Sequence, residues 1–140
     1  MDQPIVTPGS AAPTRQVLIV DDSPYIRRLL VTVLCAKYKI LEADSGVAAL
    51  QLTKAHHPNL IVLDIMMPGE INGLQVLEAI KRDPKLRDIA VAMVTARGQA
   101  GDVLDARKRG ADTYFLKPFS PCAVAAWIDS RLGSPPPASN

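Results

Sequence analysis

The sequence predicts an α/β domain, doubly wound around a five-stranded parallel sheet with helices on both faces. Five short apolar runs alternate with five segments of helical character along the 140 residues, and such alternation is typical of parallel sheets with crossover helices. The clearest run, Leu60–Asp64, is apolar until it ends in a carboxylate, as expected for a strand buried on both faces. Pro68 cannot continue a central strand, so the chain turns soon after Asp64.

The first half of the chain supplies two strands and two helices. The run Gln16–Val20 predicts the first strand, and Ser23 followed by Pro24 predicts a helix start, because serine caps a first turn and proline fits its first position. Lys39–Ala43 predicts the second strand, and Ser45–Gly46 opens the second helix. The apolar residues of the first helix recur at helical spacing and are Ile26, Leu29, Leu30, Val33 and Leu34.

Two helices flank the fourth strand. Asn72–Gly73 begins the third helix, whose apolar face is Val76, Leu77 and Ile80. Pro84 stops this helix, because proline cannot continue its hydrogen bonds. Ala90–Thr95 predicts the fourth strand, and a weaker fourth helix starts between Gly98 and Gly101 and ends near Gly110.

The last strand and helix complete the domain. Thr113–Lys117 predicts the fifth strand, and Ser120 caps the final helix. Its apolar face is Val124, Trp127, Ile128 and Leu132. The domain therefore covers residues 15–133, between a flexible leader at 1–14 and a Pro-rich tail or linker at 134–140.

Composition excludes several classes of protein. A net charge of +2 argues against nucleic-acid binding, and Arg27–Arg28 and Arg107–Arg109 are interpreted as solvated helix faces. Cys35 and Cys122 lack the spacing of metal sites and are expected to be buried or half-buried in helices. His56–His57 is interpreted as a pair of surface histidines. No membrane-spanning run or signal peptide is visible, so a cytoplasmic location without membrane contact is expected.

Four of the predicted strands end in polar side chains at one edge, where open α/β sheets bind ligands. Carboxylates gathered there repel one another, and their pKa values rise unless a cation compensates. Mg²⁺ is the natural cation, because it binds carboxylates together with water and phosphate oxygens. A divalent ion beside a lysine and a hydroxyl suits phosphoryl transfer. The residues concerned are Asp21, Asp22, Asp64, Thr95 and Lys117.

Four motifs taken together resemble the receiver domain of two-component response regulators. They are DDS at Asp21–Ser23, LDIMMPG at Leu63–Gly69, VTA at Val94–Ala96 and YFLKPF at Tyr114–Phe119. The resemblance covers about Arg15–Gly133. It implies a chemotaxis-regulator-like phosphoacceptor with the flavodoxin-like strand order 2-1-3-4-5, which signals rather than acting as an enzyme on other substrates.

The resemblance also implies the acceptor and its metal ligands. Asp64 would receive a phosphoryl group from a phosphohistidine on a sensor histidine kinase or a histidine phosphotransfer protein. Asp22 and Asp64, with the main-chain carbonyl of Met66, would bind Mg²⁺. Asp21 would act mostly through a metal-bound water.

By the same resemblance, two further residues would contact the phosphoryl group, and a third would change position in response to it. Lys117 would pair with it and Thr95 would hydrogen-bond it. Tyr114 would be the switch aromatic behind Thr95, on the face formed by the fourth helix, fifth strand and fifth helix. The Lys117–Pro118 peptide bond is expected to be cis, as in similar domains.

One departure from the family pattern bears on the lifetime of the phosphoryl group. Gly73 lies nine positions after Asp64 instead of the usual eight, so the Gly69–Asn72 loop is one residue longer. Met66 and Arg97 occupy the positions that flank the path of an attacking water in similar domains. Neither favours that attack, which predicts slow self-dephosphorylation; an opposing possibility is that the longer loop opens the site to solvent.

Two other functions compete with this interpretation. A Mg²⁺-dependent phosphohydrolase with an aspartate nucleophile usually carries an acid two positions later, where this chain has Met66, which cannot transfer a proton. A pseudo-receiver, used only for interaction, predicts loss of an acidic-pocket residue, and none is lost.

The sequence leaves the output partner or effector domain open. The Pro-rich ends suit both a stand-alone receiver and one joined to further domains. Thr113 stands where regulators that dimerise through this face often carry an acid, so both a monomer and a phosphorylation-dependent dimer are kept as expectations.

Overall fold

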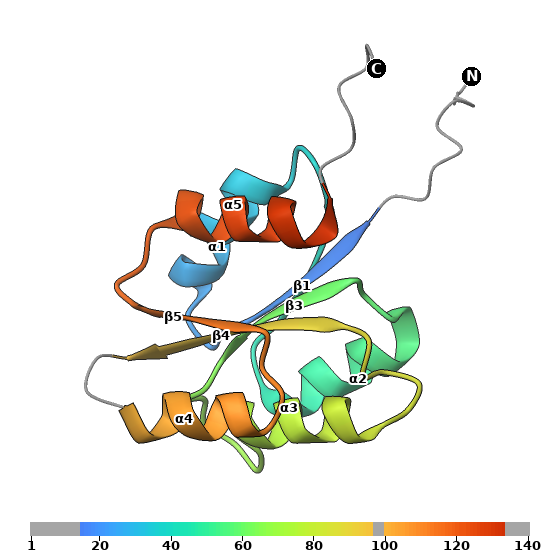
Figure 1. Ribbon diagram of the computed structural model, residues 1–140. Coiled ribbons are helices and arrows are strands. Elements are labelled where there is room, and N and C mark those ends of the chain that lie inside the picture. Colours follow the sequence, from blue (N-terminus) through green and yellow to red (C-terminus); the bar gives the residue numbers. More distant parts are fainter. Residues whose placement is uncertain (1–14, 97–99, 134–140) are drawn as a thin grey trace.

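The computed structural model describes residues 15–96 and 100–133, which form one parallel five-stranded sheet with helices on both faces (Figure 1). The strand order is β2-β1-β3-β4-β5, so the predicted fold class is confirmed. The leader 1–14 and the tail 134–140 lie outside the described residues. The elements are β1 (Gln16–Val20), α1 (Pro24–Leu34), β2 (Lys39–Ala43), α2 (Gly46–His56), β3 (Leu60–Asp64), α3 (Gly73–Arg82), β4 (Ala90–Ala96), α4 (Ala100–Lys108), β5 (Thr113–Lys117) and α5 (Pro121–Leu132).

β3 is the middle strand, and all five of its residues are buried. Side chains alternate across a strand, so Ile61 and Leu63 enter one apolar layer while Leu60 and Val62 enter the other. Helices α2, α3 and α4 cover the first layer, and α1 and α5 cover the second (Figure 1). Within the described ranges, no helix combines the length and apolar character needed to span a membrane.

The predicted helix starts are confirmed, because each cap is made by residues close together in the chain. The side chains of Ser23, Ser45 and Ser120 each accept a hydrogen bond from the main-chain N–H three residues later. Asn72 and Gln75 bond to each other's main chain in a capping box at the start of α3.

The expected burial of the two cysteines is wrong. Cys35 and Cys122 are both exposed. Cys35 lies just after α1, and Cys122 lies in the first turn of α5, beside the apolar stripe rather than on it. His56 and His57 are exposed, as predicted.

The interpretation of the arginine pairs as solvated faces holds only in part. Arg28 and Arg107 are exposed, as predicted. Arg27 and Arg109 are partly buried and form ion pairs with glutamates on other elements. Helical position alone did not reveal this, because the partners lie far away in the sequence.

Candidate functional site

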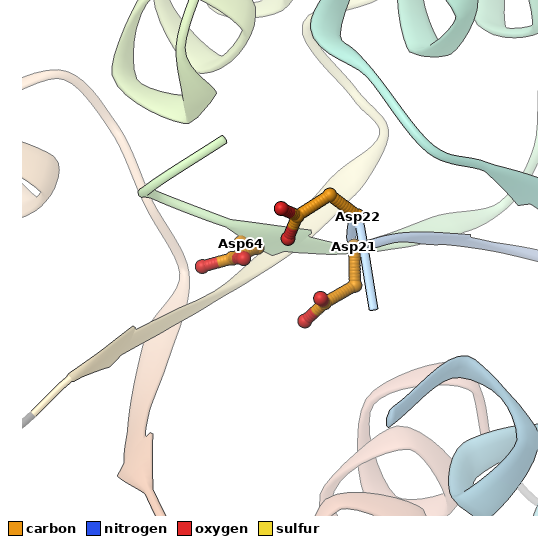
Figure 2. Close-up of side chains that lie close together, drawn as sticks. All are labelled: Asp21, Asp22 and Asp64. Carbon is orange, nitrogen blue, oxygen red and sulfur yellow. The ribbon is translucent and has the colours of Figure 1, made fainter. Parts of the chain in front are cut away.

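Three carboxylates meet at the carboxyl edge of the sheet. Asp21 and Asp22 follow β1, and Asp64 ends β3, its neighbour in the sheet. The three residues offer carboxylate oxygens that all lie within 4.8 Å of one another, and Figure 2 shows the Asp22 carboxylate turned toward Asp64. Asp21 and Asp64 are buried whereas Asp22 is exposed, so solvent reaches the cluster from the Asp22 side.

Lys117 reaches this cluster from the end of β5. Its Nζ lies 3.1 Å from Asp21 Oδ2 and 3.3 Å from Asp64 Oδ2. Burial by itself would lower the pKa of Lys117, but the carboxylates of Asp64 and Asp21 outweigh burial and raise it. The lysine therefore stays charged and holds two carboxylates at once.

Asp64 is held at both carboxylate oxygens. Oδ1 accepts a hydrogen bond of 3.2 Å from the Met66 N–H, and Oδ2 accepts one of 3.3 Å from Lys117. Burial raises the pKa of Asp64 to about 6, and the Asp21 charge adds to the rise, while Lys117 and the Met66 N–H oppose it. The pKa of this carboxyl is raised, as predicted, but burial contributes more than the carboxylate repulsion on which the prediction rested.

The donor set fits a hard divalent cation. All three side chains offer carboxylate oxygens, which are the ligands that Mg²⁺ prefers in proteins. Among the residues that the structure describes, the ammonium group of Lys117 alone pairs with carboxylates of this cluster, so negative charge is left in excess there. The charge of Asp21 adds to the effect of burial in raising the pKa of Asp64, in agreement with that excess.

Thr95 and Tyr114 lie on the same face of neighbouring strands. Tyr114 pairs in register with Met93, two residues before Thr95, and side chains two apart share a face. Thr95 is fully buried, and its hydroxyl donates to the Ala96 carbonyl at 3.5 Å. The Arg107 guanidinium lies 5.2 Å from the centre of the Tyr114 ring, within range of a cation–π interaction.

Met66 and Arg97 are the two residues predicted to control the access of water to Asp64. Met66 lies two positions after Asp64 and is 55% exposed. Arg97 lies outside the described residues. Of the two side chains, only the exposure of Met66 to solvent is therefore described.

A comparison with protein families decides the identity of the chain. The family model of the response regulator receiver domain matches residues 17–129, which include every site residue described above. The chain is a response regulator receiver domain. Its function is that of the phosphoacceptor module of two-component signalling, and this family interacts with histidine kinases and phosphotransfer proteins.

Named relatives of the receiver domain include proteins about twice its length and proteins of similar length. The chain is 40% identical over 119 residues to ycf27 of Cyanophora paradoxa, named a probable transcriptional regulator, with 84% of this chain and 48% of that protein covered. It is 38% identical over 121 residues to the polar-differentiation response regulator DivK of Brucella ovis, with 86% and 98% covered. The chain thus spans about half the length of the ycf27 relatives.

Solved structures give the same fold. The receiver domain of a signal transduction histidine kinase from Syntrophus aciditrophicus superimposes with a TM-score of 0.77 at 29% identity, covering 84% of this chain and 89% of that one. The receiver domain of Francisella response regulator 1452 gives a TM-score of 0.74 at 25% identity, covering 83% and 94%. The Lys117–Pro118 peptide bond is cis in this receiver domain, as the family resemblance predicted.

The Gly69–Asn72 loop, which the resemblance predicts to be one residue longer than usual, is supported by packing. Ile71 is half-buried and packs on the apolar layer under α2 and α3. A Cβ added to Gly46, at the start of α2, would lie 2.6 Å from Ile71 Cγ1. The loop is therefore packed closely against the first turn of α2. This packing requires glycine at position 46, because a Cβ there would clash with Ile71.

Two contacts that support the site were not predicted from the sequence, although both residues were considered there. Gly73 donates its N–H to the Ile65 carbonyl at 2.9 Å and lies against the main chain of Asp64. Arg27 donates to the main-chain carbonyl of Asp21 at 2.7 Å. Neither contact has a local sequence signal, because each joins segments brought together only by the fold.

Proposed function

We propose that this receiver domain accepts a phosphoryl group onto Asp64 from a phosphohistidine of a sensor histidine kinase or histidine phosphotransfer protein. The observation that carries the proposal is the buried Asp64 carboxylate, held by Lys117 and the Met66 N–H within a carboxylate cluster. A pKa of about 6 leaves most of this carboxyl ionised at pH 7, so it is available as a nucleophile.

Asp21, Asp22 and Asp64, with the main-chain carbonyl of Met66, would hold one Mg²⁺. When bound, the ion supplies positive charge that neutralises the phosphoryl oxygens during transfer. Asp22 is the exposed carboxylate of the cluster, so ion and phosphodonor would arrive from its side.

The transfer itself is a single displacement at phosphorus. One Asp64 oxygen forms the new bond to phosphorus, while the bond from phosphorus to the donor imidazole nitrogen breaks and its electron pair leaves with the imidazole. Lys117, already within 3.3 Å of the Asp64 carboxylate, would pair with a phosphoryl oxygen, and Thr95 would hydrogen-bond another. Both groups stand on strand ends, which keeps their positions fixed during transfer.

Met66 supports a phosphoacceptor over a hydrolase. Its thioether cannot donate or accept the proton that a hydrolytic second step requires. The product would therefore be a phosphorylated receiver rather than released phosphate.

The output would come from the α4-β5-α5 face. A phosphoryl group that bonds Thr95 differently in two states shifts their populations, and Tyr114 lies on the same face of the sheet as Thr95. Leu104 on α4 and Leu116 on β5 are 61% and 46% exposed, so apolar surface is available to a partner on this side. A beryllofluoride adduct should shift the amide resonances of α4 and β5; unmoved resonances there, with the Asp64 region shifted, would contradict the switch.

The acceptor assignment is tested by intact mass. Wild type incubated with a small phosphodonor and Mg²⁺ should gain one acid-labile phosphoryl group, and much less should form in excess chelator. Asp64→Asn should gain none under the same conditions. An Asp64→Asn protein that is phosphorylated at the wild-type rate would overturn the assignment.

A further inference from the structure

Asp21 is bonded at every polar atom that it carries. Its N–H donates to the Ala43 carbonyl at 3.1 Å, and its Oδ1 accepts from the Ser23 N–H at 2.9 Å. Its Oδ2 lies 3.1 Å from Lys117 Nζ. The remaining atom, the main-chain carbonyl oxygen, accepts a hydrogen bond of 2.7 Å from Arg27 Nη1.

Arg27 is itself held from its other side. Its Nε lies 3.0 Å from Glu42 Oε1 on β2, and its side chain is only 18% exposed. Two partners on one rigid, planar guanidinium determine its orientation. Arg28, the next residue on the same helix, is exposed.

The main-chain oxygen to which Arg27 donates lies next to Asp22 in the chain. The carbonyl of Asp21 and the N–H of Asp22 belong to one planar peptide unit, so a bond to that oxygen restrains the peptide plane that precedes the Asp22 side chain. Across the described ranges, no hydrogen bond or ion pair holds the Asp22 carboxylate itself. Its aim toward Asp64 (Figure 2) therefore depends on the main chain that carries it.

We propose that Arg27 is a positioning residue of the metal site, which aims the Asp22 carboxylate at Asp64 through the Asp21–Asp22 peptide, and that Glu42 holds Arg27 in place. The inference rests on the proposed Mg²⁺ binding. The proposal predicts that loss of Arg27 weakens Mg²⁺ binding, which is opposite to the effect of removing its charge alone. Removing a positive charge near carboxylates strengthens cation binding by electrostatics, whereas releasing the Asp21–Asp22 peptide weakens it.

The test compares Arg27→Met with Arg28→Met in the full chain. Each removes one positive charge from the same helix, but only the first removes the bond to Asp21. Calorimetric titration of the chelator-treated proteins with MgCl₂ should give Arg27→Met a dissociation constant about tenfold above wild type. Arg28→Met should stay within about twofold of wild type, because an exposed charge is screened. Equal or tighter Mg²⁺ binding by Arg27→Met would overturn the proposal.

A second measurement needs no metal. Amide hydrogen exchange of Asp22 and Ser23 should be faster in metal-free Arg27→Met than in Arg28→Met, because the turn after β1 has lost its anchor. Unchanged exchange at both amides would also overturn the proposal. Failure of wild type to bind Mg²⁺ would contradict the proposed function instead, and the exchange comparison would still decide the role of Arg27.

A conservative variant covers the case in which Arg27→Met does not fold. Arg27→Lys keeps the charge, but its single nitrogen lacks the fork that reaches both Asp21 and Glu42. It should show a smaller rise in the Mg²⁺ dissociation constant, with the same direction of change in amide exchange. Wild-type values for both quantities in Arg27→Lys, in that case, would refute the positioning role.

Discussion

The Lys117 ammonium nitrogen lies 3.3 Å from a carboxylate oxygen of Asp64, although the two residues end strands that β4 separates. The same nitrogen lies 3.1 Å from Asp21. One cation thus serves two buried carboxylates, which is too little to cancel the effects of burial and repulsion on Asp64. Folding therefore raises the pKa of this carboxyl, and the stability of the metal-free protein must depend on pH.

Asp64→Asn is expected to stabilise the metal-free protein at neutral pH. The folded pKa of about 6 exceeds the ordinary value of 3.8, so between these values the folded state binds more protons than the unfolded state. The stabilisation that Asp64 contributes through its raised pKa is then fully present below about pH 4 and is lost as the pH rises through 6. Asparagine does not titrate, so the variant should gain stability at pH 7.5 and not at pH 4. Urea unfolding in chelator at several pH values measures this; parallel pH profiles for the two proteins would contradict it.

Met66→Asn is expected to shorten the lifetime of the phosphorylated protein. Met66 is exposed beside Asp64 and offers no strong hydrogen bond to a water, whereas an amide does. One added hydrogen bond of about 1 kcal/mol corresponds to roughly fivefold faster decay. The measurement is loss of the phosphoryl group after donor removal, with Met66→Leu as a control that should decay at the wild-type rate. If the asparagine variant decays no faster, the loop at Gly69–Asn72 is the better explanation of water access.

Gly73→Ala is expected to damage the site as well as the fold. The added Cβ would overlap the Asp64 carbonyl oxygen and lie 2.7 Å from Ile65 Cα, and neither is the end of a flexible side chain. The cost should be about 3 kcal/mol of unfolding free energy, with slower phosphorylation because the Asp64 main chain must shift. Gly69→Ala is the control: its φ of +113° strains an alanine, but a Cβ there meets nothing within 4 Å. Normal phosphorylation of Gly73→Ala would show that Asp64 tolerates the displacement.

Tyr38→Phe is expected to loosen α5 from the loop after α1. The Tyr38 hydroxyl donates to Asp129 Oδ1 at 2.5 Å, and Lys37 Nζ lies 2.8 Å from Asp129 Oδ2. Loss of this bond should lower the unfolding free energy by about 1–2 kcal/mol. Tyr25→Phe, at a position 68% exposed, is the control and should cost little; equal stability of the two variants would contradict a role for the Tyr38–Asp129 bond.

The same bond predicts a loss of stability in alkali. Burial and the bond to Asp129 raise the pKa of Tyr38 above its ordinary value of 10.0. A raised folded pKa means that the stabilisation is fully present below pH 10 and declines as the pH rises further. Wild type should therefore lose more stability above pH 10 than Tyr38→Phe does, which chemical unfolding across that range would measure.

The fold and the residues of the carboxylate cluster could be predicted from the sequence, because both depend on relations along the chain. Caps such as Ser23 act on residues three positions away, and the uninterrupted apolar run before Asp64 indicates a strand covered on both faces. Parallel strands share one direction, so ends far apart in sequence, such as those at Asp21 and Lys117, must meet at one edge.

Only the tertiary structure decided which side chains support that cluster. Arg27 looked like one of two solvated arginines, and its two bonds, to Asp21 and to Glu42 on the next strand, exist only after β2 packs beside β1. Gly73 similarly acquires its tight contact with Asp64 when α3 folds back over the end of β3. Hydrophobic periodicity reports which face of a helix is buried, but a single polar contact depends on the three-dimensional position of a distant partner, which no local pattern encodes.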